Sequence, residues 1–218
     1  MKKCFICLLA LLAMVSFVSC SEDEPTTPNP GTEQNGDDSN SNGDGSGDDS
    51  QPGEPGANSN ILVAYFSWGG TTQRMAQQIV GQTGADLFRI EPVTPYPENY
   101  TECTEVALDE LNNNARPAIA GTIDSETWAE YDTVFVGCPV WWHTVPMIIC
   151  TFAESYDFEG KTVVPFCTYA STYRDETLAR MVELTPDANH LTGLVLTSSR
   201  LNDEDNVTSW LREIGVIE

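Results

Sequence analysis

Basic side chains are scarce in this chain of 218 residues, which has ten Lys and Arg against 33 Asp and Glu and a net charge of −23 at pH 7. A surface that binds nucleic acid requires clustered Lys and Arg, so the composition argues against DNA or RNA as a partner. Adsorption to anionic lipid is disfavoured for the same reason. The chain has only two His and no C-x-x-C pair beyond residue 20, so it also lacks the ligands of a zinc site.

Several motifs of nucleotide and ester chemistry are absent as well. The chain contains neither the Walker pattern G-x-x-x-x-G-K-S/T nor the dinucleotide pattern G-x-G-x-x-G. No G-x-S-x-G elbow surrounds Ser67, and two His leave little choice of a general base. A hydrolase is therefore disfavoured, although α/β folds host many of them.

The N-terminus has the pattern of a secretory signal. Two lysines precede an apolar run from Phe5 to Val18, which is too short to span a bilayer as a helix. A small residue stands directly before Cys20, as in a bacterial lipobox. We therefore expect residues 1–19 to be a lipoprotein signal peptide and Cys20 to be lipidated. The protein would then lie outside the cytoplasm, lipid-anchored to a bacterial membrane at its periplasmic face or at the cell surface. A plain cleaved signal is the alternative.

The segment 20–60 is predicted to be a disordered acidic tether. After Cys20 it has ten acidic residues, no basic residue and no large apolar side chain. Such a segment cannot offset the entropy of ordering, and about forty residues of coil reach roughly 30–40 Å. This is enough to hold a folded domain clear of a membrane. The cluster Glu22-Asp-Glu24 resembles a surface-export signal of some Gram-negative lipoproteins, or it is simply part of an acidic linker.

Residues 61–218 alternate between two patterns, which indicates a single α/β domain. Continuous runs rich in Val, Ile and Phe predict buried strands at 61–66, 86–90, 133–137, 162–166 and 191–197. Amphipathic stretches predict helices at 72–83, 102–113, 146–155, 175–184 and 203–214. The alternation predicts a five-stranded parallel sheet with helices on both faces, that is, three layers. Right-handed crossovers then bring the carboxyl ends of all strands to one edge, where ligands bind.

The first loop at this edge has the composition of a phosphate site. Ser67-Trp-Gly-Gly-Thr-Thr72 joins the first strand to the first helix. Loop N–H groups and hydroxyls converge there on one point, and the helix adds roughly half a positive charge at its N-terminus. The loop contains no Lys or Arg, so neutral donors would hold the anion.

The second loop, Gly137-Cys-Pro-Val-Trp-Trp-His-Thr-Val-Pro146, has two adjacent tryptophans between a strand and a helix. Large aromatic side chains in such a loop suit stacking on a planar ligand. We expect one of the two indoles to fill the core beneath the loop instead.

These segments resemble the flavodoxin family. The first loop is similar to the family pattern Ser/Thr-x-Thr/Ser-Gly-x-Thr, although Gly69 stands where a hydroxyl is usual. The stretch from Val136 to Pro146, the stretch 151–168, Pro95-Tyr-Pro-Glu-Asn-Tyr100 and Arg116-Pro117 resemble a bacterial subgroup with a G-x-P-x-W-W loop. The resemblance covers nearly all of 61–218. It implies a flavodoxin-like sheet with the strand order 2-1-3-4-5.

The same resemblance implies FMN as the cofactor. The phosphate would be held by Ser67, Trp68, Gly70, Thr71 and Thr72. The ring would be flanked by Pro139, Val140, Trp141 and Trp142, with His143 beside it and Thr168, Tyr169 and Ala170 in the third loop. Relatives often have glycines in that third loop, whereas this chain has none between Thr168 and Arg174. Tyr169 or Tyr173 would therefore either stack on the ring or occupy part of the site.

The resemblance implies an FMN-binding electron-transfer protein or oxidoreductase, with a quinone as one conceivable acceptor. It leaves open the electron donor and acceptor, and whether the protein is an enzyme or a carrier. No residue needs to act as a nucleophile. The alternative is a flavodoxin-fold lipoprotein without flavin that serves as a surface binding module, which the glycine-free third loop favours.

The cysteines of the domain are expected to be core thiols. Cys138 and Cys167 each end an apolar run, where a small buried side chain packs well. A disulfide is permitted outside the cytoplasm, but the spacing does not indicate one.

Overall fold

The computed structural model of the chain describes residues 60–218. The predictions for the signal peptide, for lipidation of Cys20 and for the tether lie outside these residues. Within the described part, no helix is both long enough and apolar enough to cross a lipid bilayer.

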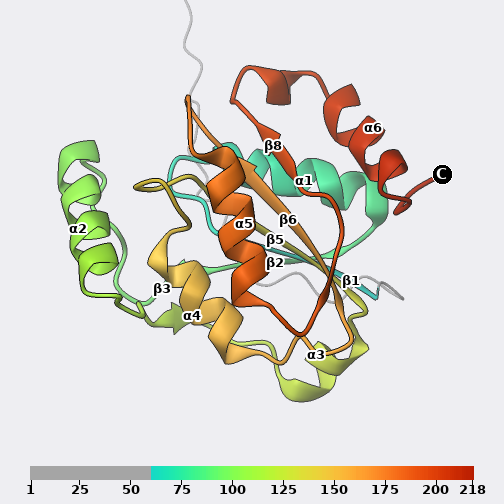
Figure 1. Cartoon of the computed structure of the whole chain (residues 1–218), viewed down its shortest axis with the longest axis horizontal. Helices are drawn as coiled ribbons and strands as arrows, with labels where there is room; N and C mark the ends of the chain where they lie inside the picture. Colours follow the sequence, from blue (N-terminus) through green and yellow to red (C-terminus); the bar gives the residue numbers. More distant parts are fainter. Residues whose placement is uncertain (1–59) are drawn as a thin grey trace, which may run out of the picture. The chain divides into compact units, whose positions relative to one another are not determined.

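The described residues form a parallel sheet in which the longest strands are central (Figure 1). The strands are β1 (Ile61–Tyr65), β2 (Asp86–Arg89), β5 (Thr133–Pro139), β6 (Thr162–Thr168), β7 (Asn189–His190) and β8 (Leu194–Leu196). They pair in the order β2-β1-β5-β6-β7, and β8 also pairs with β6. With β7 and β8 taken as two parts of the fifth strand, this is the predicted order 2-1-3-4-5. The predicted α/β fold is confirmed.

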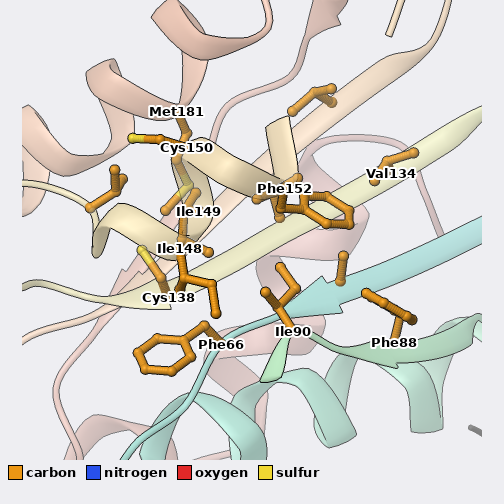
Figure 2. Packing of buried hydrophobic residues seen from close by; sticks show 14 of the residues in the cluster. Phe66, Phe88, Ile90, Val134, Cys138, Ile148, Ile149, Cys150, Phe152 and Met181 are labelled. Atoms are coloured by element: carbon orange, nitrogen blue, oxygen red, sulfur yellow. The ribbon is translucent and has the colours of Figure 1, made fainter. Parts of the chain in front are cut away.

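Helices cover both faces of the sheet, which makes three layers. α1 (Thr71–Thr83) and α6 (Asp205–Glu213) lie on one face, and α3 (Ser125–Glu130), α4 (Met147–Ser155) and α5 (Arg174–Leu184) lie on the other. Alternation along β1 explains the two cores, since Val63 and Tyr65 face α1 while Leu62 and Ala64 face α4. Figure 2 shows the core on the α4 side of the sheet, where Phe66, Ile90 and Cys138 pack against the side chains of α4.

The fifth strand differs from the prediction because it is broken in two. The amide of Leu191 donates to the carbonyl of Val163. The backbone N–H and C=O groups of every second residue of β6 therefore point toward the fifth strand, and the next such residue after Val163 is Pro165. Proline has no N–H to donate, so the ladder is interrupted at this point. Gly193 packs against the Pro165 carbonyl in the gap. The strand resumes at β8.

The connection between β2 and β5 also differs from the prediction. The predicted helix 102–113 exists as α2 (Tyr100–Asn112), but it is part of an excursion and not the crossover itself. A two-stranded antiparallel pair, β3 (Glu91–Pro92) and β4 (Ile119–Ala120), closes the base of this excursion. The short α3, which the sequence analysis missed, then leads into β5. These elements have two to six residues, too few for a periodic pattern.

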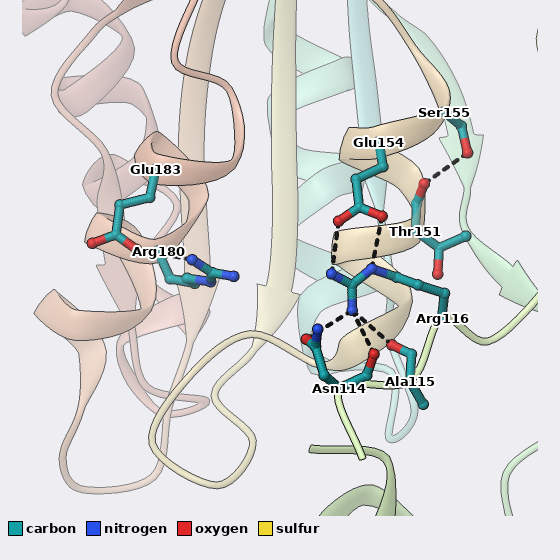
Figure 3. A network of polar contacts seen from close by, with 8 residues as sticks. All are labelled: Asn114, Ala115, Arg116, Thr151, Glu154, Ser155, Arg180 and Glu183. Carbon is teal, nitrogen blue, oxygen red and sulfur yellow. Dashed lines mark hydrogen bonds and ion pairs between the residues drawn. The ribbon is translucent and has the colours of Figure 1, made fainter. Parts of the chain in front are cut away.

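An arginine fastens the end of the excursion to the body of the domain. Arg116 forms two parallel bonds of 2.7 Å with the Glu154 carboxylate on α4 (Figure 3). Its remaining amino group donates to the carbonyls of Asn114 and Ala115 at 3.0 Å. The guanidinium also lowers the pKa of the Glu154 carboxyl. Such a forked pair fixes orientation as well as distance.

The four cysteines of the described residues are free and buried, as expected of core thiols. Cys138 and Cys167 are neighbours in the register of β5 and β6. Burial raises the pKa of both thiols, that of Cys167 to about 12.

We predict that Gly137→Ala destabilises the fold. A Cβ at Gly137 would overlap the outer ring atoms of Phe166, its neighbour on β6. Overpacking of this kind should lower the free energy of unfolding by about 3 kcal/mol in a urea titration. Gly81→Ala is the matched control, because Gly81 is exposed in α1 with open space around it, and it should raise stability by about 0.5–1 kcal/mol. Equal stability of the Gly137 variant and the unmodified protein would refute the close packing.

Candidate functional site

The loops at the carboxyl edge of the sheet enclose one cavity of about 970 Å³. All but one of the predicted site residues line it. They are Ser67, Trp68, Thr71, Thr72, Pro139, Val140, Trp141, Trp142, His143, Thr168, Tyr169 and Ala170. Gly70 does not line the cavity. Its φ of +80° instead makes the turn that starts α1, a backbone conformation that glycine adopts without strain.

The first loop presents uncapped donors to the cavity. No side chain caps the N-terminus of α1, and its first turn has no acidic residue. The first amides of a helix have no partner within the helix, so they remain available to a ligand. Thr72 lies in this turn, and its hydroxyl is 2.7 Å from the hydroxyl of Thr168 at the end of β6. Both are buried, and this bond joins the first loop to the third.

The second loop contains a strained turn. Trp141 and Thr144 exchange backbone hydrogen bonds of 3.0 and 2.9 Å around Trp142 and His143. Both central residues have left-handed φ angles, +43° and +70°. Asn and Gly usually occupy these positions, and a larger residue there costs about 1 kcal/mol or more. The turn therefore needs support from its surroundings.

The two tryptophans pack differently, and one of them packs on the core beneath the loop, as expected. The Trp141 ring packs edge-on against Phe66 at 5.2 Å and against Tyr96 at 5.0 Å, in the core beneath the loop. Trp142 is 41% exposed, and its indole N–H donates to the Thr104 carbonyl of α2 at 2.8 Å. Trp142 thus ties the second loop to the excursion and presents its ring at the cavity.

The third loop leaves the cavity open despite its bulk. Tyr173, which also has a left-handed φ, stacks on His143 at 3.6 Å and does not line the cavity. Tyr169 does line it, and Arg174 lies over its ring and donates to its hydroxyl at 3.2 Å. The His143–Tyr173 stack supports the strained turn from outside.

The sequence analysis missed two further parts of the wall. α2 contributes Tyr100, Cys103, Thr104 and Ala107, and the loop after β8 contributes Thr197, Ser198 and Ser199. The three consecutive hydroxyls after a strand are a signal that could have been found. The α2 residues had no such signal, because only the folding of the excursion brings them to the sheet edge.

The side chains that line the cavity are mostly hydroxyl-bearing, aromatic or small apolar ones. Among the described residues that line it there is no Asp, Glu, Lys or Arg, although the domain 61–218 has a net charge of −15. Hydroxyls gather around the start of α1, whereas Trp142, Val140 and Ala107 make the wall apolar elsewhere. The cavity thus suits a ligand with one polar, anionic end and one planar, apolar end.

Besides the Trp142–Thr104 bond, a second hydrogen bond holds α2 beside the cluster of the Phe66, Tyr96 and Trp141 rings. The Tyr96 hydroxyl donates to the Glu110 carboxylate on α2 at 2.8 Å. Partial burial raises the pKa of Glu110 despite this bond. Burial and the neighbouring carboxylate raise the pKa of Tyr96 as well.

Comparisons with known proteins agree with this geometry. A family model described as flavodoxin matches residues 60–214. The chain is similar to a provisionally named flavoprotein from Bacteroides eggerthii, with 37% identity over 72% of this chain and 98% of that one and a TM-score of 0.63. A second, from Bacteroides uniformis, is 33% identical over 70% and 97% of the two chains, also with a TM-score of 0.63. A flavoprotein from Lactobacillus acidophilus, solved in complex with FMN, shares the fold at 23% identity over 69% and 97%, with a TM-score of 0.57. No curated protein matches the chain.

We predict that Glu110→Gln alters how stability depends on pH. Because the pKa of Glu110 is raised on folding, its favourable contribution is present at low pH and is lost as pH rises through the folded-state pKa. Glutamine keeps an acceptor for Tyr96 and does not titrate. The urea midpoint of the variant minus that of the unmodified protein should therefore increase from about pH 4 to about pH 7.

Glu105→Gln controls for the loss of one negative charge, since Glu105 is exposed on the same helix. Parallel pH profiles for the Glu110 variant and the unmodified protein would show that this carboxyl is not perturbed.

Proposed function

Since the chain belongs to the flavodoxin family, we propose that its cavity binds FMN and that the protein is an electron carrier or an FMN-dependent oxidoreductase. The family match and the FMN complex of the Lactobacillus relative support this cofactor. The observation that carries the proposal is that the start of α1 and Trp142, which are far apart in sequence, line one cavity.

The residues of the cavity fit FMN in both charge and shape. Ser67, Thr71 and Thr72 would hold the phosphate together with the uncapped amides of α1. Trp142 would stack on the ring, and Pro139 and Val140 would bring backbone groups of the second loop to it. The bound cofactor would supply the redox chemistry, accepting and releasing electrons singly or in pairs. The chain's own part is to bind the cofactor, orient it and limit the access of water.

We propose that the protein meets its electron donor and acceptor outside the cytoplasm. The signal pattern and Cys20 support a lipid anchor on a bacterial membrane, and the acidic segment after Cys20 supports a tether. A membrane quinone is one acceptor that such a location would allow. The strongly acidic surface favours cationic protein partners over anionic ones.

FMN binding can be tested with two variants that act on opposite ends of the ligand. Titration of the purified chain with FMN should quench flavin fluorescence at micromolar concentrations. Ser67→Ala should weaken FMN about fivefold and riboflavin much less, because riboflavin lacks the phosphate. Trp142→Ala should weaken both ligands by a similar factor, since it removes the stacking surface.

The failures of this experiment have separate meanings. If the unmodified chain neither quenches nor retains FMN, the proposed function is wrong. If Ser67→Ala weakens FMN and riboflavin equally, FMN binding stands but the phosphate does not lie at the first loop.

The lipid anchor has its own test. A bacterial host that expresses the full chain and is supplied with a labelled fatty acid should incorporate label into the protein, and Cys20→Ala should abolish it. Label that persists in the variant would place the acyl chain elsewhere or make the incorporation unspecific.

A further inference from the structure

The loop after β8 forms a further part of the cavity wall. Thr197, Ser198 and Ser199 follow β8 at the carboxyl edge of the sheet, and all three line the cavity. They add three hydroxyls to those of Ser67, Thr71, Thr72 and Thr168 at the hydroxyl-rich end of the cavity. Hydroxyls of both loops are therefore available to an anion bound at this end of the cavity.

Few contacts within the loop fix the hydroxyl of Ser198. The Thr197 and Ser199 hydroxyls bond to each other at 3.0 Å, and the amide of Leu201 donates to the Thr197 carbonyl. Ser198 itself is exposed, and a small exposed side chain with no partner would be free to rotate. Its partner comes from another element.

That partner is Arg74, one turn into α1. One amino group of its guanidinium is 3.2 Å from the Ser198 hydroxyl and 3.4 Å from the Ser198 carbonyl, and the other is 3.3 Å from the Asn202 side-chain oxygen. Gln78 lies on the same face of α1 and donates to the Leu201 carbonyl at 3.0 Å. The planar fork spans both ends of the Ser198–Asn202 segment, which a lysine could not do.

Arg74 also carries a positive charge that no carboxylate of the described residues pairs with. Within residues 60–218, the arginines that form ion pairs are Arg89, Arg116, Arg174 and Arg180, and Arg74 is not among them. The charge of Arg74 therefore adds to the positive end of the α1 dipole. It lies outside the cavity lining, so its effect on a ligand is exerted through the loop and through its field.

We infer that Arg74 is a positioning residue for the anionic end of the bound cofactor, holding the Thr197–Ser199 loop as the second wall of the phosphate site. This rests on the proposed function, since it presumes that the hydroxyl-rich end receives the FMN phosphate. Ser198 and Ser199 then contribute to phosphate binding only while Arg74 fixes the loop against α1.

The test compares FMN with riboflavin in variants of the full chain. Arg74→Met should weaken FMN about fivefold and leave riboflavin nearly unchanged, because only FMN has the phosphate. Arg74→Lys, which keeps the charge but lacks the fork, should recover only part of this loss. Arg212→Gln removes a positive charge at the end of α6, where its contact is the Glu218 carbonyl, and serves as the charge-matched control.

Coupling separates action through the loop from a simple field effect. If Arg74 acts through Ser198, the double variant Arg74→Met/Ser198→Ala should lose no more FMN affinity than the stronger single variant. In the ligand-free chain, Arg74→Met should also speed amide hydrogen exchange at Thr197–Ser199 while α1 keeps its protection.

Equal weakening of FMN and riboflavin in Arg74→Met would reduce Arg74 to a support of the fold and overturn the inference. Unchanged exchange at Thr197–Ser199, or losses that multiply in the double variant, would overturn it as well. If the unmodified chain binds no FMN, the proposed function fails first and the inference falls with it. That outcome is distinct because it is seen before any variant is made.

Discussion

The parallel pairing of β1, β5 and β6 is the constraint on which the rest of this structure depends. The register places Tyr65 opposite Gly137 and Gly137 opposite Phe166, so β5 and β6 end together, two residues beyond the end of β1. Their loops must therefore emerge together at one edge. A slip of one residue would turn Val63 or Phe135 to the opposite face, where a different core is packed. Both cores thus oppose any change in the register that assembles the cavity.

Strain in the backbone is concentrated around that cavity. Four non-glycine residues of the described chain have left-handed φ angles, and three of them, Trp142, His143 and Tyr173, lie in its second and third loops. The reciprocal Trp141–Thr144 bonds, the indole bond to Thr104 and the His143–Tyr173 stack hold them in place. Strained conformations persist where several surrounding contacts fix them. Here they hold the exposed ring of Trp142 in position before a ligand binds.

The electrostatics of the site run against those of the domain. The cavity is lined without fixed carboxylates, in a domain whose net charge is −15. Hydroxyls and helix amides bind an anion through directional hydrogen bonds as well as through their partial positive charge, because each donor must point at the ligand. A cation such as Arg74 just outside the lining offsets part of the surrounding negative potential without entering the cavity.

The sequence alone determined the layer architecture and most of the site. Buried apolar runs and amphipathic stretches in strict alternation allow only a covered parallel sheet, and residues directly after strands must meet at its edge. That reasoning reached Ser67, Thr72, Trp142 and Thr168 because each ends a strand or follows one closely. Tertiary structure alone decided which indole packs on the core, since Trp141 and Trp142 are identical in chemistry and differ only in what packs around them. It also decided the break at Pro165, which depends on the side of the neighbouring strand that the missing N–H faces. The wall built by α2 and the reach of Arg74 to Ser198 join residues far apart along the chain, and no local pattern encodes such distances.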